Sequence, residues 1–307
     1  ASVVVLKSGG EYKLHFVGEK ITLKKGDTYN RSPYSGYTIQ DVFSGTFVQN
    51  RTRSDNNGAV YKEMWNKYAS NVTEVTIDAS FKKVQLINAY GYFKGMERLT
   101  SIKGIGNLDT KNAKDLGSMF SGCKKLTSIE GSAISTASAT RLDYMFNNCE
   151  LLTSVNSVQF GSSDIATNCQ RMFYNCKSLK EISRYNCPHT GKAHDLSYMF
   201  YGCESLTSVP LTRMNTDAAQ DMTSMFEGCK KLKNLSDLTH FNVEWVCYFE
   251  KMFKDCTELT EVNLSTWNTT KFGVSSYKYI SGMFANCPNL RKGPLGANFT
   301  FDRIWNQ

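Results

Sequence analysis

The side chains of this sequence that could bind a metal or act as nucleophiles include ten cysteines and four histidines. Cys187, His189 and His194 lie close together as Cys-x-His-x4-His, and thiolate and imidazole groups are common zinc ligands. A structural zinc site needs four ligands, and no fourth residue stands at a recognisable spacing. The alternative is that Cys187 packs in the core, while His15 and His240 are isolated and predicted to be ordinary surface or boundary residues.

No pattern in the sequence points to catalysis. Nucleophilic catalysis needs a nucleophile, a base and an orienting group that converge in one pocket, and no such set stands out. The glycines form no phosphate-binding loop of the type G-x-x-x-x-G-K-S/T, and no pair of carboxylates is set apart from its surroundings. We therefore predict a protein that is not an enzyme, with no catalytic residue, no metal site and no cofactor.

Seven of the ten cysteines belong to a motif that recurs along the chain, Met-Phe-x-x-Cys-x-x-Leu-x-x-apolar. An internal repeat outweighs other clues to a fold, because each copy is one structural unit that packs against the next. An eighth, more divergent copy begins at Tyr92-Phe93. The copies of the motif begin at Met119, Met145, Met172, Met199, Met225, Met252 and Met283. The leucine positions follow one another at 26 or 27 residues, except for a last step of 31, at Val72, Leu99, Leu126, Leu152, Leu179, Leu206, Leu232, Leu259 and Leu290.

Each repeat is predicted to contain one short helix and one short strand. Small and apolar residues precede Met-Phe by six and three positions, so that with Phe and Cys they fall at relative positions 0, 3, 7 and 10, a helical spacing. The segment Leu-x-x-apolar has Thr or Ser in its gaps and is predicted to be extended. We expect an α/β leucine-rich-repeat solenoid, a right-handed coil with a parallel concave sheet and short helices on the convex side.

The seven repeated cysteines are predicted to be buried thiols and not disulfides. In a stack of repeats they form one column, whose neighbours lie about 4.8 Å apart with parallel Cα–Cβ directions. A disulfide prefers Cβ atoms about 3.8 Å apart, so the column geometry does not suit one. Cys169 takes a column position that is otherwise apolar, and Cys187 takes the place of Ile134 and Trp267, so both are expected in the core.

The Met-Phe-x-x-Cys array resembles the leucine-rich repeats of BspA-like bacterial surface proteins, in the subtype found in lipoproteins. Residues 211–216 leading into 221–226 match that repeat closely, as do residues 264–269, and the resemblance covers residues 60 to 293. The resemblance implies a secreted or cell-surface bacterial protein that acts in adhesion to host or neighbouring-cell components and has no known active site. It implies no particular ligand and leaves the first 59 residues unexplained.

We expect three parts in the chain. Residues 1–59 form a β-rich N-terminal cap or small domain, in which residues 2–8 and 12–17 pair as a hairpin around Gly9-Gly10 and Ile21–Leu23 adds a strand. Residues 60–293 form about eight repeats, and residues 294–307 form a C-terminal cap. The end repeats need covers, because they would otherwise expose apolar cross-sections. Candidate covering aromatics are Phe43, Phe47, Tyr61, Trp65, Tyr68, Phe81, Phe299, Phe301 and Trp305.

The predicted binding surface is the concave sheet, which presents small polar side chains. The partner is expected to be an unidentified extracellular protein or glycan, and a structural spacer in an envelope assembly is the alternative. The net charge of +8 comes from scattered lysines, which does not favour nucleic acid. No apolar run is long enough to cross a bilayer, and a first residue Ala1 suggests an exported chain whose leader was removed. The candidate ligand-binding residues are Ser128, Glu130, Ser154, Asn156, Glu181, Ser183, Ser208, Asn234, Ser236, Glu261 and Asn263.

Overall fold

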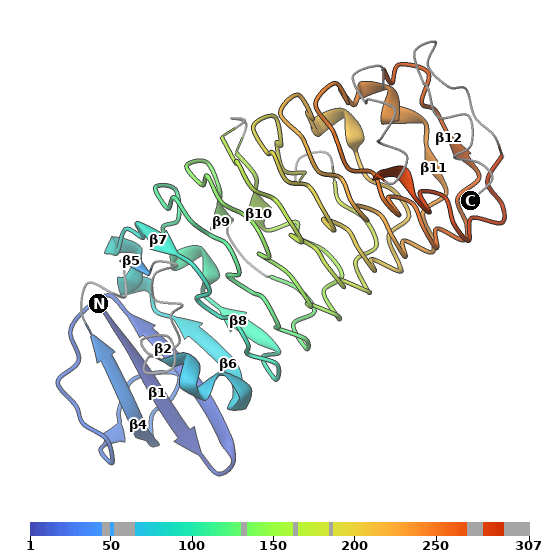
Figure 1. Ribbon diagram of the computed structural model, residues 1–307. Helices are drawn as coiled ribbons and strands as arrows, with labels where there is room; N and C mark the ends of the chain where they lie inside the picture. The colour runs from blue at the N-terminus through green and yellow to red at the C-terminus, as the bar shows by residue number, and fades with distance from the viewer. Residues whose placement is uncertain are drawn as a thin grey trace.

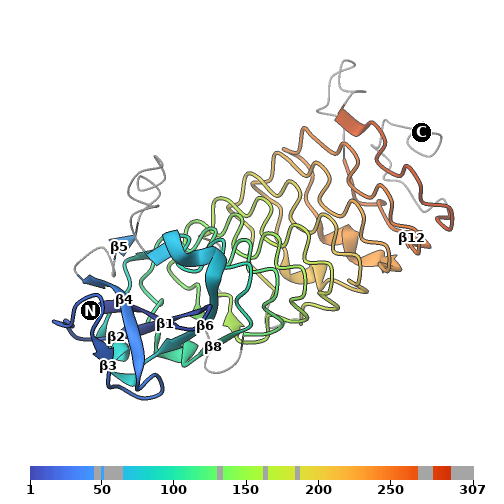
Figure 2. The ribbon, with the colours of Figure 1, turned by 90° about the horizontal axis from the view of Figure 1, so that it is seen from below.

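The repeats stack side by side into an elongated body with a β-sheet at its N-terminal end (Figure 1). The computed structural model describes residues 1–44, 50–51, 65–129, 134–161, 165–183, 187–268 and 279–291. Seen from below, the same coils follow one another along the whole stack (Figure 2). Over the described ranges, no helix combines the length and the apolar character needed to cross a membrane.

Strands are the main regular elements, and all of the described helices are short 3-10 helices. The strands are β1 Ser2–Ser8, β2 Glu11–Val17, β3 Thr28–Tyr29, β4 Tyr37–Ser44, β5 Asn50–Arg51, β6 Val72–Ile77, β7 Asn88–Ala89, β8 Ser101–Lys103, β9 Ile134–Ser135, β10 Val158–Gln159, β11 Asn234–Leu235 and β12 Glu261–Val262. The 3-10 helices are η3 Trp65–Asn71, η4 Ala79–Lys83, η5 Ile105–Asn107, η7 Leu211–Arg213 and η8 Ser236–His240.

The N-terminal strands continue directly into the sheet of the first repeats. The sheet has the order β3-β4-β1-β2-β6-β8, in which β2 runs parallel to β6 and β6 runs parallel to β8. The predicted hairpin is confirmed, since β1 and β2 pair antiparallel with Ser8 opposite Glu11. The predicted strand at Ile21–Leu23 is wrong: β4 takes the place beside β1, and Ile21 is buried in a small core with Val4 and Leu6.

The phenylalanines of the Met-Phe motif form one continuous stack through the core. The rings of Phe120 and Phe146 lie with centroids 5.3 Å apart, and those of Phe146 and Phe173 lie 5.5 Å apart, nearly parallel in both pairs. The same contact joins each later pair up to Phe253 and Phe284. The prediction that equivalent side chains of successive repeats lie on top of one another is therefore confirmed.

The predicted helices on the convex side are wrong. Tight turns take their place. We call them the Met-Phe turns, and each runs from two residues before Met to Cys. Their backbone N–H groups donate alternately to a carbonyl of the next repeat and to the carbonyl three residues earlier in the same repeat. In the first full copy, Phe120 N donates to Met145 O in the next repeat at 2.9 Å, and Cys123 N donates to Phe120 O at 3.0 Å. Every second N–H donates its hydrogen bond to the neighbouring repeat. An α-helix cannot form, because all of its backbone hydrogen bonds lie within one segment.

Two residues in each Met-Phe turn have a left-handed backbone. One precedes Met, as at Ser118 with φ of 54°, and the other precedes Cys, as at Gly122 with φ of 81°. Only Gly, Asn and Asp visit this region readily, and the second position is restricted to them. Its occupants are Gly95, Gly122, Asn148, Asn175, Gly202, Gly228, Asp255 and Asn286.

An aromatic cluster lies at the N-terminal end of the phenylalanine stack. Phe16 contacts Trp65 and Phe81 at centroid distances of 5.7 Å, and Tyr92 at 5.8 Å. Trp65 and Phe81 are fully buried, and Phe43 packs partly buried against the same core. Among the other predicted covering aromatics, Tyr68 stacks on Tyr12. The rest, including the whole predicted C-terminal cap, lie outside the described residues.

Candidate functional site

The leucine segments present one continuous polar surface, which we call the strand face. Residue pairs Glu181–Ser208 and Asn234–Glu261 are parallel bridge partners, so equivalent positions of successive repeats lie side by side. The apolar positions between them, such as Leu179 and Ile182, are buried. Within this face Asn156, Glu181, Ser208, Asn234 and Glu261 are exposed, and Ser128, Ser154, Ser183 and Asn263 are half-buried.

Two predicted residues of this face cannot be placed, and a third has a local role. Glu130 and the side chain of Ser236 lie outside the described part of the chain. The side-chain oxygen of Asn263 accepts a hydrogen bond from Ser265 N at 3.0 Å. This bond closes a turn of the asparagine's own backbone, a common role for this residue type. Asn263 therefore shapes the end of its strand segment.

Threonines follow six of the nine leucine positions along the strand face, and the other three are followed by Lys180, Lys233 and Arg291. Thr153 Oγ1 donates to Thr127 O at 3.0 Å, and Thr260 Oγ1 donates to Lys233 O at 3.0 Å. The backbone N–H of Thr153 also donates to Thr127 O, at 2.9 Å. Each such hydroxyl proton is engaged within the stack, so the hydroxyl oxygen is left as an acceptor. The sequence analysis used these threonines only to predict an extended segment and did not predict their hydrogen bonds between repeats.

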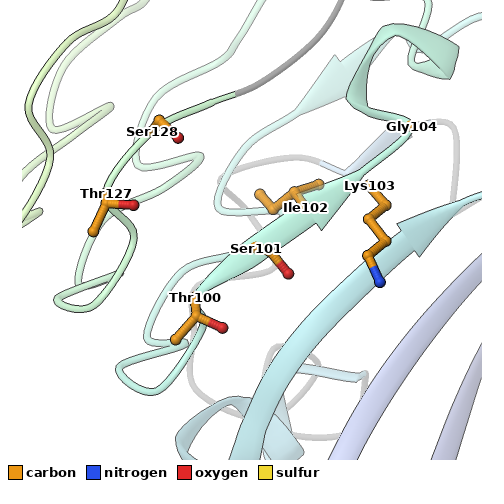
Figure 3. A pocket seen from close by; sticks show the side chains of 7 residues that line it. All are labelled: Thr100, Ser101, Ile102, Lys103, Gly104, Thr127 and Ser128. Atoms are coloured by element: carbon orange, nitrogen blue, oxygen red, sulfur yellow. The ribbon is translucent and has the colours of Figure 1, made fainter.

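A hollow of about 460 Å³ opens in the strand face between β8 and the next leucine segment (Figure 3). It is lined by residues 100–104 of β8 and its flanks, and by Thr127 and Ser128. The hollow lies where the six-stranded sheet ends, because β8 pairs with β6 on one side and no described strand pairs with its other edge. Backbone groups at such an edge are available to a ligand.

Most residues of this hollow were missed by the sequence analysis. Only Ser128 belonged to the predicted surface, although Ser101 and Lys103 follow Leu99 at the spacings by which Ser128 and Glu130 follow Leu126. The divergent copy at residues 92–102 was identified as a repeat, so the row could have been extended by one repeat. The signal was present in the sequence and was not used.

An ion pair borders the hollow on the side of β6. Lys103 extends over β6 in Figure 3, and its Nζ lies 3.0 Å from Oε2 of Glu74. Tyr34 Oη donates to Glu74 Oε1 at 2.7 Å. Burial alone would raise the pKa of Glu74, but the hydrogen bonds from Tyr34 and Lys103 outweigh it and the pKa lies below its ordinary value. Glu74 therefore stays ionised and holds Lys103 beside the sheet.

The cysteine and histidines considered for metal binding have other partners. Cys187 is fully buried, and burial raises the pKa of its thiol to about 12. The Nε2 atom of His189 lies 2.6 Å from Nη2 of Arg213, and His194 Nδ1 lies 3.1 Å from Ala218 O. Across the described ranges, no three His, Cys, Asp or Glu residues are grouped as metal ligands would be. Cys187 serves as a core residue, as its repeat position predicts.

The repeated cysteines have a structural role in joining successive repeats. Cys149 Sγ donates to Phe120 O at 3.1 Å, and Cys176 Sγ donates to Phe146 O at 3.1 Å. The equivalent bond recurs at every cysteine of the column. Burial raises the pKa of these thiols well above its ordinary value, so they stay protonated as weak donors. The prediction that they pack in the core holds for six, and Cys287 is half-buried.

Three of the known structures that match this chain are 14–16% identical to it. A crystal structure of a TLR13–ssRNA13 complex is 15% identical, with a TM-score of 0.36; the match covers 76% of this chain and spans only 30% of that one. A leucine-rich repeat protein from Bacteroides ovatus is 14% identical over 94% of this chain and 98% of its own, with a TM-score of 0.23. A leucine-rich cell surface protein from Faecalibacterium prausnitzii is 16% identical over 99% and 94%, with a TM-score of 0.23.

These scores are too low to carry a conclusion about function, and no curated protein matches the chain. A family model gives a firmer result. The model described as "Mycoplasma protein of unknown function, DUF285" matches residues 87–195 and 167–295, and so covers more than half of the chain. Both matched stretches consist of the Met-Phe-x-x-Cys repeats whose phenylalanines form the stack. The chain belongs to the DUF285 family.

Proposed function

We propose that this protein is a non-enzymatic binding protein of the bacterial cell surface or the secreted fraction. Its partner is an extracellular protein or glycan of the host or of a neighbouring cell, and it acts as an adhesin. The observation that supports the proposal best is the strand face, an exposed polar surface that continues from repeat to repeat and opens into the hollow beside β8.

The strand face suits repeated weak contacts better than one tight contact. Its exposed residues are small, polar or charged, whereas the residues that dominate tight protein interfaces are Trp, Tyr and Arg. Outward positions recur at each repeat and carry Ser, Asn or Glu two residues after each leucine position from Val72 to Leu259, so a ligand with repeating hydroxyl groups can bind at several repeats at once. Several weak contacts held by one rigid scaffold add up to a high overall affinity.

The finer assignments are part of the same proposal. We propose that the stack is a right-handed leucine-rich-repeat coil of the BspA-like subtype, with the strand face on its concave side. Residues 1–59 then cover the first repeat, for which the aromatic cluster around Phe16 gives support. Residues 294–307 cover the last repeat.

A binding screen tests the proposal. The intact chain is applied to arrays of extracellular matrix proteins and of glycans, with single-stranded RNA as a separate arm. Binding to a protein or a glycan that falls at least ten-fold in Glu181→Lys and Glu261→Lys is the expected result. The matched control is Glu244→Lys, which reverses an exposed acidic residue outside the strand face.

Two results would contradict the proposal. One is binding that both strand-face variants leave unchanged, which would place the site elsewhere. The other is binding to RNA alone, which would assign a different partner class. Absence of binding to any probe would favour the alternative of a structural spacer, in which residues 1–59 serve as the attachment to other envelope components.

A further inference from the structure

A cluster of tyrosines lies on the Met-Phe turns, away from the strand face. Two rows of side chains leave these turns, one from the residue before Met and one from the residue after Phe. The rings of Tyr174 and Tyr201 stack with centroids 4.6 Å apart and planes 7° apart. The guanidinium of Arg171 lies over Tyr198 at 4.8 Å and over Tyr174 at 5.4 Å. The result is a half-buried aromatic platform on successive repeats.

A hollow begins where this platform ends. The row before Met carries Tyr144, Arg171 and Tyr198, then a small serine at Ser224, then Lys251. The step from large to small side chains leaves a hollow of about 350 Å³ between Tyr198 and Lys251, which we call the tyrosine hollow. Its lining includes Tyr174, Tyr198, Tyr201, Ser224, Glu227 and Glu250.

The tyrosine hollow contains a buried carboxylate. Glu227 is only 7% exposed, although it borders the hollow. Ser224 Oγ donates to Glu227 Oε2 at 2.7 Å, and Lys254 Nζ donates to Oε1 at 2.9 Å. A carboxylate in this setting is neutralised and held in place, yet it keeps lone pairs for a further donor. It therefore presents a fixed hydrogen-bond acceptor next to the tyrosine rings.

The charges around the hollow disfavour a charged ligand. Lys254 neutralises Glu227, Lys251 lines the hollow, and Arg171 lies over the ring of Tyr198, which also lines it. A cationic ligand would meet these bases, and an anionic ligand would meet Glu227 and Glu250. An uncharged ligand avoids both penalties, provided that it has hydroxyl groups for the carboxylates and an apolar face for the rings.

We propose that the tyrosine hollow binds a pyranose unit of an uncharged glycan. The C–H face of the sugar ring packs against Tyr201 and Tyr198, and its hydroxyls donate to Glu227 and Glu250. This site differs from the strand face, so it adds a second binding surface to the proposed function and does not depend on the first.

The proposal is tested by titrating the intact chain with maltopentaose, cellopentaose and N-acetylchitopentaose, followed by calorimetry and saturation-transfer NMR. At least one of these oligosaccharides is expected to bind, and Tyr201→Ala is expected to weaken that binding at least ten-fold. Ser224→Tyr places in the hollow the residue that Tyr198 and Tyr144 supply at the same repeat position, also with a left-handed backbone. This variant is expected to abolish binding while the protein stays folded.

Tyr248→Ala is the matched control, because Tyr248 is an exposed tyrosine that packs on Tyr279 and does not line the hollow. It is expected to leave the affinity unchanged. The proposal is overturned if none of the three oligosaccharides binds, or if binding persists in both Tyr201→Ala and Ser224→Tyr. Loss of binding in Glu181→Lys with full binding in Tyr201→Ala would also overturn it, and would leave the strand-face proposal standing.

Discussion

Removal of one ring from the middle of the phenylalanine stack is expected to destabilise the protein strongly. Phe173 is fully buried and lies between two parallel rings, 5.5 Å from Phe146 and 5.4 Å from Phe200. Truncation of a buried phenylalanine to alanine costs about 3–5 kcal/mol, and stacking on both faces of the ring places this site toward the upper end of that range. We expect Phe173→Ala to lower the free energy of unfolding by about 4–5 kcal/mol.

Urea unfolding followed by near-ultraviolet circular dichroism measures this change. Two variants provide the comparison. Phe284→Ala removes a ring that is 7% exposed, whereas Phe173 is fully buried, so a smaller loss of about 2–3 kcal/mol is expected. Ser154→Ala changes a half-buried residue of the strand face and should stay within about 0.5 kcal/mol.

The reasoning is refuted if Phe173→Ala and Ser154→Ala have equal effects. It is also refuted if Phe284→Ala costs more than Phe173→Ala, because a fully buried ring must stabilise the protein more than a less completely buried one. Unfolding in two separate steps would not refute it, since repeat arrays lose cooperativity when a central interface is weakened. In that case the decrease in the free energy of unfolding is expected in the first of the two steps.

Three further predictions concern single residues. Burial lowers the pKa of His15 to about 4, below its value in the unfolded chain, so its contribution is present above about pH 6.5 and is lost as the pH falls towards 4. About 2.5 kcal/mol of unfolding free energy should disappear between pH 7.5 and 4.5, relative to His15→Asn measured in parallel. Ellman's reagent should label the exposed Cys247 rapidly, the half-buried Cys287 more slowly and the six buried column thiols only on unfolding, and Cys247→Ser should remove the rapid phase. Asn175→Val should cost about 1–3 kcal/mol by thermal unfolding, because φ there is 55°, while Asn175→Gly should cost less.

The repeat columns were sufficient to predict the core. Phe120, Phe146 and Phe173 occupy one column in the sequence and one stack in the structure. Equivalent residues must meet when copies of one unit pack against one another, because each copy repeats the same buried face. The hairpin of β1 and β2 was predictable for a different reason, since Gly9-Gly10 separates two segments rich in Val, Leu, Tyr and Phe that are typical of strands.

The helices were predicted wrongly because two structures share the same apolar spacing. Buried residues three and four apart fit a helix, but they also fit turns closed by bonds from residue i to i−3, such as Cys123 N to Phe120 O. The residue before each cysteine distinguishes the two. Gly122, Asn148 and Asp255 are poor helix formers and favour a left-handed backbone, so this column indicates a turn in every copy.

The two candidate sites differ in how far the sequence could locate them. The strand face could be predicted from the repeat motif, because the residue two positions after each repeated leucine points out of the stack. Ser101 could have been included on that ground. The tyrosine hollow follows from a departure from the pattern. Ser224 gives no signal by itself, and it forms a hollow only because Tyr198 and Lys251 flank it in the neighbouring repeats.

This contrast has a physical basis. In a stacked array, each outward position is in contact with the same position one repeat earlier and one repeat later, so the shape of the surface depends on differences between neighbours. A uniform row gives a flat surface, and a change from Tyr to Ser gives a hollow. The buried positions that hold the array together must stay alike, as the phenylalanine stack does. Specific recognition in such a protein therefore has to arise where the outward rows change, and the turns around Ser224 are such a place.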